Sequence, residues 1–98
     1  MAPISPVERL RSLEPELRAR GVASLYLFGS AARGDAREGS DIDLFFDDEP
    51  HVRLSLLDVI GIQHFLEDAL NTPVDVMTRD SLHPMMRADI EAEAVPVF

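Results

Sequence analysis

The sequence predicts an α/β domain (α+β) in which a mixed sheet of three or four strands is flanked by helices. Its 98 residues are enough for one core and leave no room for a separate substrate-binding domain. Hydrophobic residues make up 46% of the chain and are spread along it, as is typical of a globular protein. Segments with apolar residues at helical spacing alternate with short β-rich runs.

The first element is a helical segment over residues 5–20. Ser5 can cap it and Pro6 suits its first helical position. Because Pro15 interrupts the apolar pattern, we expect two short helices, or one kinked helix, with the break just before that proline. Gly21 is a suitable residue for the end of the segment.

Two strands are expected next, over residues 23–28 and 40–46, with a short helix over 31–35 between them. Gly29 and Ser30 end the first strand. Side chains alternate between the two faces of a strand. In the second strand this alternation puts Ile42, Leu44 and Phe46 on one face and Asp41, Asp43 and Phe45 on the other.

The remaining elements follow from the same patterns. An acidic turn over residues 47–51 precedes a helix over 53–70, which has apolar residues on more than one face and should be the most buried helix. A strand over 74–78 and a helix over 81–92 come next, and residues 94–98 can add a short edge strand. In the strand over 74–78, Val74 and Val76 share one face, and Asp75 and Met77 the other.

Charge and composition exclude several classes of function. The net charge is −9 and all nine positive charges are arginines, so there is no basic stripe to neutralise phosphates and no direct nucleic-acid binding is expected. Without cysteine, neither disulfides nor Cys-ligated zinc can form. The sequence has no signal-peptide pattern and no run near the ~20 apolar residues of a membrane span. We therefore expect a soluble, cytoplasmic protein.

Three carboxylates point to metal chemistry. Asp41 and Asp43 leave one face of a strand about 6.6 Å apart at the backbone, given ~3.3 Å of rise per residue, and Asp75 adds a third from the same face of another strand. Clustered carboxylates repel one another unless they share cations. Two divalent ions about 3.5–4 Å apart are the arrangement used in phosphoryl and nucleotidyl transfer. Mg²⁺ is expected because a site made of oxygen donors suits a hard cation.

A phosphate site is expected next to these carboxylates. Gly29 and Ser30 would present backbone N–H groups and a hydroxyl to a phosphate, and Gly29 has no Cβ to block its approach. Arg33 could reach the same phosphates with its fork of donors. Ser30 could instead be a helix N-cap, and Arg33 a structural partner of Asp35 or Glu38.

Simpler interpretations exist for the acidic residues and for the long helix. Asp41 and Asp43 could belong to a solvated strand edge or turn, and Asp75 could be an exposed residue of a half-buried strand. The residues from Asp47 to Glu49 most simply form a solvated acidic turn. The scattered histidines suit surface or core-rim positions, and the apolar helix belongs to the core, with surplus apolar residues for a partner interface. These histidines are His51, His64 and His83.

The spacing of these residues resembles that of a known family. Gly29-Ser30, ten intervening residues and then Asp41-Ile42-Asp43 resemble the GS-x10-DxD signature of the nucleotidyltransferase superfamily of DNA polymerase β. More narrowly, LFGSAARGDAREGSDIDL, PVDVMT and the C-terminal residues look like the minimal nucleotidyltransferases, small proteins encoded beside HEPN-domain toxins. The resemblance covers nearly the whole chain, so residues 1–98 are expected to form a single nucleotidyltransferase domain.

The resemblance implies a role for each residue of the signature. Asp41 and Asp43 would hold two Mg²⁺ ions, Asp75 would help to bind one of them and orient the attacking hydroxyl, and Gly29 and Ser30 would hold the triphosphate of ATP or another NTP. Characterised members are antitoxins that transfer AMP or short adenylate from ATP to a tyrosine hydroxyl of a HEPN-domain partner and so silence its RNase activity, in type VII toxin–antitoxin systems.

Two other functions remain open at this point. The chain could be a non-catalytic antitoxin that blocks a HEPN partner by occlusion, with its nucleotide site idle. It could also be a nucleotide-sensing regulatory module.

Overall fold

The computed structural model describes residues 6–33 and 41–98, apart from the side chains of Ala31 and Arg33, and it contains a four-stranded sheet with the order β3-β2-β1-β4. β2 and β3 are parallel, whereas β1 runs antiparallel to both β2 and β4. This arrangement confirms the predicted α/β fold with a mixed sheet. The elements are α1 (Pro6–Ser12), α2 (Glu14–Ala19), β1 (Val22–Phe28), α3 (Ser30–Arg33), β2 (Ile42–Asp48), α4 (Leu56–Leu70), β3 (Val74–Thr78), the 3₁₀ helix η1 (Arg79–Ser81), α5 (Pro84–Glu93) and β4 (Val95–Pro96).

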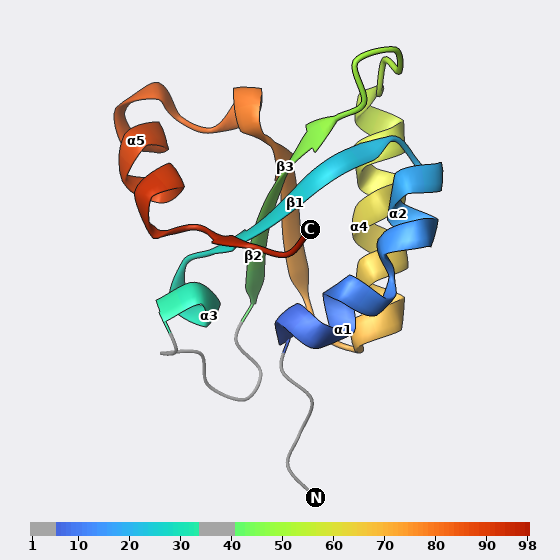
Figure 1. The fold of residues 1–98 in the computed structure, drawn as a ribbon, viewed down its shortest axis with the longest axis horizontal. Helices are drawn as coiled ribbons and strands as arrows, with labels where there is room; N and C mark the ends of the chain where they lie inside the picture. Colours follow the sequence, from blue (N-terminus) through green and yellow to red (C-terminus); the bar gives the residue numbers. More distant parts are fainter. Residues whose placement is uncertain (1–5, 34–40) are drawn as a thin grey trace, which may run out of the picture.

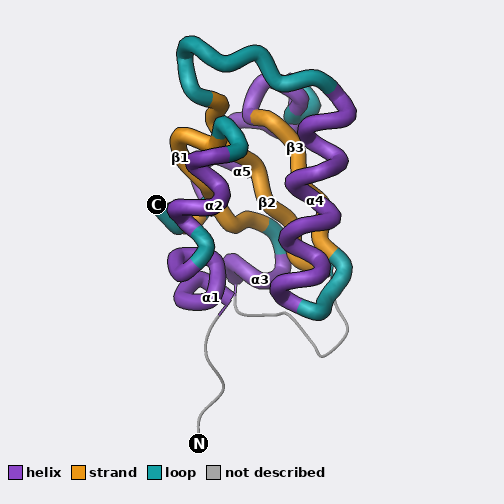
Figure 2. The backbone as a smooth tube through the Cα atoms, turned by 90° about the vertical axis from the view of Figure 1, so that its right-hand side faces the viewer, coloured by secondary structure: helices purple, strands orange, loops and turns teal. Residues whose placement is uncertain are grey.

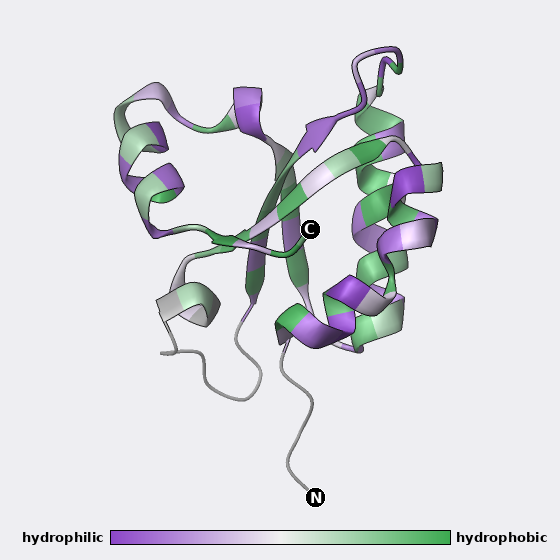
Figure 3. Ribbon diagram, viewed as in Figure 1, coloured by the Kyte–Doolittle hydropathy of each residue, from purple (hydrophilic) through white to green (hydrophobic). Residues whose placement is uncertain are grey.

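Helices lie on both faces of the sheet. α1, α2 and α4 cover one face, and α5 lies on the other (Figures 1 and 2). The main core lies under the first group, where α4 is largely hydrophobic along its length (Figure 3). The core residues come from helices and strands alike: Leu10, Leu17, Val22, Leu25, Leu27, Ile42, Leu44, Phe46, Ile62, Leu66, Leu70, Val74, Val76 and Val97.

The N-terminal helical segment is broken where the sequence predicts. α1 and α2 are separate helices joined at Leu13, and Pro15 occupies the first turn of α2. Leu10 and Leu17 are fully buried, so each short helix contributes one residue to the buried core. Gly21 has a φ of +99°, which suits a residue just after a helix. The predicted Ser5 cap lies outside the described residues.

β2 is shifted along the chain from the predicted strand over 40–46. It begins at Ile42, leaving Asp41 just before it, and it continues through Asp47 and Asp48. The physical reason is the length of its neighbour, because β1 begins at Val22, which pairs with Asp48. The prediction of an acidic turn from residue 47 onward was therefore wrong for its first two residues. The turn begins at Glu49, whose N–H donates to the Gly21 carbonyl over 2.9 Å.

α4 begins later than predicted because a capping box fixes its start. The Ser55 hydroxyl accepts a hydrogen bond from the Asp58 N–H, and the Asp58 carboxylate accepts one from the Ser55 N–H. These two exchanges satisfy N–H groups that have no partner inside the helix. The hydrogen bonds from the Ser55 backbone and side chain lower the pKa of Asp58. Asn71, with a φ of +52°, follows the last helical residue.

α4 contributes both to the core and to the surface. Three of its residues are buried, against one each from α1 and α2 and none from α5. Its first turn is exposed, with Leu56 and Leu57 75% and 78% accessible. Both halves of the sequence interpretation, a core helix with surplus apolar residues, therefore hold.

The C-terminal elements follow the prediction with a later helix start. β3 has the predicted bounds, but residues 79–81 form η1, so α5 begins only at Pro84, where His83 caps it by accepting a hydrogen bond from the Met85 N–H. β4 pairs with β1 at the edge of the sheet, where Pro96 is tolerated. Across the part of the chain that the structure covers, none of the helices has the length and apolar character to cross a membrane.

Candidate functional site

The strand register brings two of the predicted carboxylates together. Asp43 of β2 lies directly opposite Asp75 of β3 in a parallel ladder. Their sequence neighbours, including Ile42 and Val74, point to the opposite face and are buried in the core. Asp43 is half-buried and Asp75 is exposed. The predicted parity of the two strands is therefore correct, and both carboxylates emerge on the face that carries α5.

The ends of β2 and β3 that carry these aspartates are fixed by hydrogen bonds. The Ile42 N–H donates to the Pro73 carbonyl over 3.1 Å, and the Val74 N–H donates to the Glu67 carboxylate over 3.2 Å. Glu67 belongs to α4, so the helix that packs under the sheet also sets the start of β3. Asp41 is exposed and lies one residue before β2.

Gly29 adjoins the Asp43 side chain. It follows β1 with a φ of +74°, a conformation that residues with a Cβ rarely adopt. A Cβ at this position would lie 2.5 Å from Oδ2 of Asp43. The Gly29 N–H donates to Oε1 of Glu93 over 3.1 Å. Gly29 is therefore required both by the turn and by the close approach of a carboxylate.

Ser30 and Arg33 are the two ends of α3. Ser30 is half-buried at the first position of this single helical turn, and the Ala32 N–H donates to the Gly29 carbonyl over 3.1 Å. The Arg33 side chain is outside the described part of the structure, as are both of its alternative partners, Asp35 and Glu38. The phosphate-binding roles of Ser30 and Arg33 therefore stay predictions.

The donors fit a hard divalent cation by type and by backbone position. Asp43 and Asp75 offer carboxylate oxygens from adjacent strands, the chemistry that Mg²⁺ prefers. Oδ2 of Asp43 occupies the place that a side chain at Gly29 would fill. As the side chains stand, no three Asp, Glu, His or Cys residues within 6–33 and 41–98 form a group that could hold a metal ion. The strands place the carboxylates side by side, and the side chains would have to turn toward a shared cation in order to bind it.

Arg79 organises the same face of the sheet beyond the aspartates. Its guanidinium donates to both carboxylate oxygens of Asp47, over 2.7 and 3.0 Å, and to Glu91 of α5 over 2.5 Å. It also lies over the rings of Tyr26 and Phe45, 4.9 and 5.1 Å from their centroids. Hydrogen bonding to Asp47 raises the pKa of Arg79.

This cluster corrects the interpretation of Asp47 as part of a solvated turn. Asp47 instead pairs with Arg79 and thereby joins β2 to the segment after β3. Phe45, which shares the face of Asp43 as predicted, is 1% exposed and stacks on Tyr26. A small aromatic and ionic layer therefore lies between the sheet and α5.

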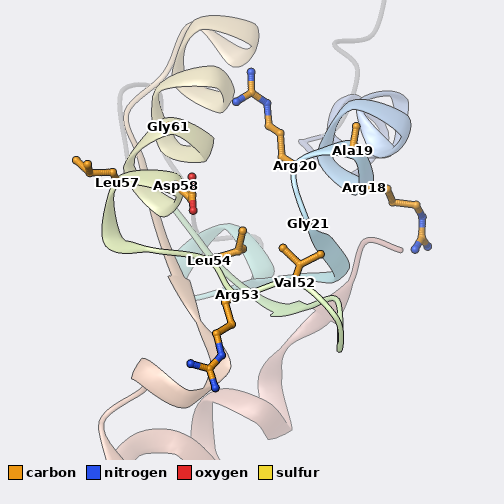
Figure 4. Close-up of a pocket in the computed structure, with 10 residues that line it drawn as sticks. All are labelled: Arg18, Ala19, Arg20, Gly21, Val52, Arg53, Leu54, Leu57, Asp58 and Gly61. Carbon is orange, nitrogen blue, oxygen red and sulfur yellow. The ribbon is translucent and has the colours of Figure 1, made fainter.

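Other candidate features lie away from the aspartates. The three histidines are all exposed, as predicted, and His83 caps α5. A pocket of about 440 Å³ lies between α2 and α4, which cover the sheet face opposite Asp43 (Figure 4). None of the predicted site residues lines it. Its lining consists of Arg18, Ala19, Arg20, Gly21, Val52, Arg53, Leu54, Leu57, Asp58 and Gly61.

Two residues near the site were missed in the sequence, Arg79 and Glu93. Arg79 follows β3 directly, a position that carries no pattern of its own. Glu93 had a weak signal, because an acidic residue at the C-terminal end of a helix opposes the helix dipole and so indicates that its partner lies elsewhere. In the structure the Glu93 carboxylate accepts a hydrogen bond from the Gly29 N–H.

Comparison with known proteins identifies the family. A family model described as the nucleotidyltransferase domain matches residues 9–97, which include every candidate residue. The chain therefore belongs to the nucleotidyltransferase domain family, and the enzyme class expected from the sequence, a nucleotidyltransferase, is confirmed.

Individual relatives and solved structures identify a narrower group within this family. A protein of Methanocaldococcus jannaschii assigned to the protein adenylyltransferases is 40% identical over 90% of this chain and 92% of its own length. The protein adenylyltransferase MntA of Thermococcus cleftensis is 37% identical over 90% of this chain and 88% of its own. A solved structure assigned as a minimal nucleotidyltransferase has a TM-score of 0.76 and 34% identity, over 92% of this chain and 94% of that one. The resemblance to the minimal nucleotidyltransferases is confirmed.

The fold also occurs in a toxin–antitoxin complex. A structure of a tri-AMPylated HEPN toxin with an MNT antitoxin, from Shewanella oneidensis, matches with a TM-score of 0.69 over 93% of this chain and 70% of that chain. At 18% identity, this likeness shows the fold alone.

Proposed function

We propose that this protein transfers AMP from ATP to a hydroxyl group of a partner protein in a Mg²⁺-dependent reaction. The observation that carries the proposal is the meeting of Gly29, Asp43 and Asp75, three residues from three separate segments of the chain. Gly29 places a backbone without a side chain against the Asp43 carboxylate, and the carboxylates of Asp43 and Asp75 on adjacent strands supply oxygen ligands for the cations of a triphosphate.

The choice of AMP and of a protein acceptor is supported by the relatives. Those with 37–40% identity over nine-tenths of this chain are protein adenylyltransferases by name or assignment. The structural neighbour from Shewanella oneidensis pairs an MNT antitoxin with an AMPylated HEPN toxin. We therefore propose a HEPN-domain RNase toxin as the partner and a cytoplasmic antitoxin of a type VII system as the biological role.

The reaction needs few groups from the protein itself. The acceptor oxygen attacks the α-phosphorus of ATP, the bond from that phosphorus to the bridging oxygen breaks, and pyrophosphate leaves with the bonding electrons. The proton of the acceptor hydroxyl passes to a carboxylate or to water. Asp75, exposed on β3 beside Asp43, is the carboxylate that can orient this hydroxyl by accepting its hydrogen bond.

Asp41, Asp43 and Asp75 would hold two Mg²⁺ ions, and Gly29, Ser30 and Arg33 would hold the phosphates. Bound Mg²⁺ supplies neutralisation of the triphosphate and of the charge that develops as pyrophosphate leaves. The register of β2 and β3 keeps the carboxylates of Asp43 and Asp75 next to each other.

A protein partner also gives a reason for the exposed apolar residues. The first turns of α4 and α5 each carry two large apolar side chains that are more than half exposed. Adjacent exposed apolar residues mark protein interaction sites more often than single ones do. These residues are Leu56, Leu57, Met85 and Met86.

The test is transfer of label from ATP. Purified protein is mixed with Mg²⁺, ATP labelled in the adenine and α-phosphate part, and a HEPN-domain protein from the adjacent gene. We expect label on the partner and release of pyrophosphate. A tight complex without label would overturn the transferase proposal in favour of an antitoxin that acts by occlusion. ATP binding without complex or transfer would favour a nucleotide sensor.

Asp43→Asn should abolish transfer because it removes a carboxylate at the centre of the site. Without Mg²⁺ it should leave the melting temperature unchanged or raise it, because like charges directly opposite each other on adjacent strands are destabilising. Asp48→Asn is the matched control, an exposed residue at the far end of the same strand, and it should keep transfer. Transfer retained by Asp43→Asn together with lowered stability would refute the assigned role.

A further inference from the structure

The carboxylate of Glu93 accepts a hydrogen bond from the Gly29 N–H, the group at which the nucleotide is proposed to bind. The Gly29 N–H, next to Asp43, donates to Oε1 of Glu93 in a part-buried hydrogen bond of 3.1 Å. A carboxylate and a phosphate are both anionic acceptors for such an N–H group. The two compete for this donor if the triphosphate reaches Gly29.

Contacts made by residues before and after Glu93 in the sequence hold it at this position. Two residues earlier, Glu91 pairs with Arg79 and Arg87, which attaches the end of α5 to the aromatic and ionic layer. Two residues later, Val95 pairs with Leu27 of β1 in the sheet. The contact with Gly29 therefore belongs to a segment held at both ends.

The helix dipole does not favour a carboxylate at the position of Glu93. Glu93 is the last residue of α5, and no basic residue lies in that last turn, so its charge opposes the helix dipole. The contact with Gly29 spans 64 residues of sequence. The Glu93 carboxylate therefore adds a negative charge near Asp43, at the place where the triphosphate is proposed to bind.

We propose that Glu93 is an internal competitor of the nucleotide, a carboxylate that holds the Gly29 N–H in the nucleotide-free protein and is displaced by the terminal phosphates of ATP. Glu93 thereby sets the affinity of the site for nucleoside triphosphates. This inference rests on the proposed function, because it takes Gly29 as a phosphate donor.

The test compares ATP binding, in the presence of MgCl₂, by the wild-type chain and by Glu93→Gln. Glutamine keeps an oxygen acceptor for the Gly29 N–H and removes only the charge. Removing one like charge from the site should tighten the Kd for ATP by about three- to tenfold. AMP lacks the terminal phosphates, so its Kd for Glu93→Gln should agree with its Kd for the wild type within about a factor of two. Glu93→Ala, which removes the acceptor as well, should change the Kd for ATP in the same direction.

Asp89→Asn is the matched control, because Asp89 is exposed on the same helix and its replacement changes the net charge equally. An unchanged or weaker Kd for ATP in Glu93→Gln, with ATP bound by the wild type, would overturn this inference alone. Equal tightening for AMP, or in Asp89→Asn, would also overturn it, since the effect would then be one of general charge. If neither wild type nor Glu93→Gln binds ATP, the proposed function fails first and this inference with it. Tighter ATP binding by Glu93→Gln without any label transfer would support Glu93 as a competitor of ATP and would refute the proposed transfer of AMP.

Discussion

At the scale of single residues, Gly29 is the residue most tightly constrained by the site. Gly29→Ala should destabilise the protein by about 1–2 kcal/mol, because alanine is strained at positive φ. It should also abolish label transfer under conditions where the protein remains folded, because the new Cβ would lie 2.5 Å from Oδ2 of Asp43. Urea denaturation and the transfer assay measure the two effects separately.

Gly21→Ala separates backbone strain from disturbance of the site. Gly21 also has positive φ, and a Cβ there would lie 3.0 Å from the end of the Leu54 side chain, on the other face of the sheet. We expect a comparable loss of stability with transfer retained. Wild-type transfer by folded Gly29→Ala would show that the space beside Asp43 is not needed.

The sequence predicted the residues whose placement is local. Gly29 ends a β-rich run, and the common face of Asp43 and Asp75 follows from the alternation of side chains along strands. The contacts of Glu93 and Arg79 could not be predicted in this way. They join residues 64 and 32 positions apart, and they depend on how α5 docks against the sheet.

At the scale of elements, α4 offers a stabilising substitution. Gly61 lies inside this helix, and a Cβ added to it meets nothing within 4 Å. Gly61→Ala should therefore raise the free energy of unfolding by up to about 1 kcal/mol, the difference in helix propensity between the two residues. Urea denaturation measures it, and transfer should not change because α4 lies on the sheet face opposite Asp43. A loss of stability would mean that this side of α4 is more closely packed than the structure indicates.

Element types were easier to predict than element ends. The ends depend on interactions that apolar periodicity does not report. α4 begins at Leu56 because Ser55 and Asp58 form a capping box, and that signal stands in the sequence as S-L-L-D. β2 runs on through Asp47 because β1 pairs with it and Arg79 binds its carboxylate, and neither cause is visible in the acidic run itself.

At the scale of the whole molecule, Arg79 joins three parts of the fold. It links β2 through Asp47, α5 through Glu91 and β1 through the ring of Tyr26. Arg79→Ala should destabilise the protein by about 1–3 kcal/mol, because it removes both hydrogen bonds to the partly buried carboxylate of Asp47 and one of the two arginines that pair with Glu91. It should also increase amide hydrogen exchange in α5 more than in α4.

Arg79→Lys is the control that separates the positive charge of Arg79 from the hydrogen-bonding geometry of its guanidinium. Lysine keeps the positive charge but cannot donate to both oxygens of Asp47 in the way that a guanidinium does. We expect an intermediate loss of stability. If Arg79→Ala matched the wild type in stability and in exchange, α5 would be held by its other contacts alone.

β3 lies at one edge of the sheet, which has a consequence for solubility. Edge strands can pair with other chains, and short length and charged residues oppose this. β3 has five residues, and Asp75 is the one charge among them. Replacing it with valine would give the run VVVMT, whose β-propensity and lack of charge favour aggregation. The carboxylate proposed to orient the acceptor thus also protects the sheet against self-association.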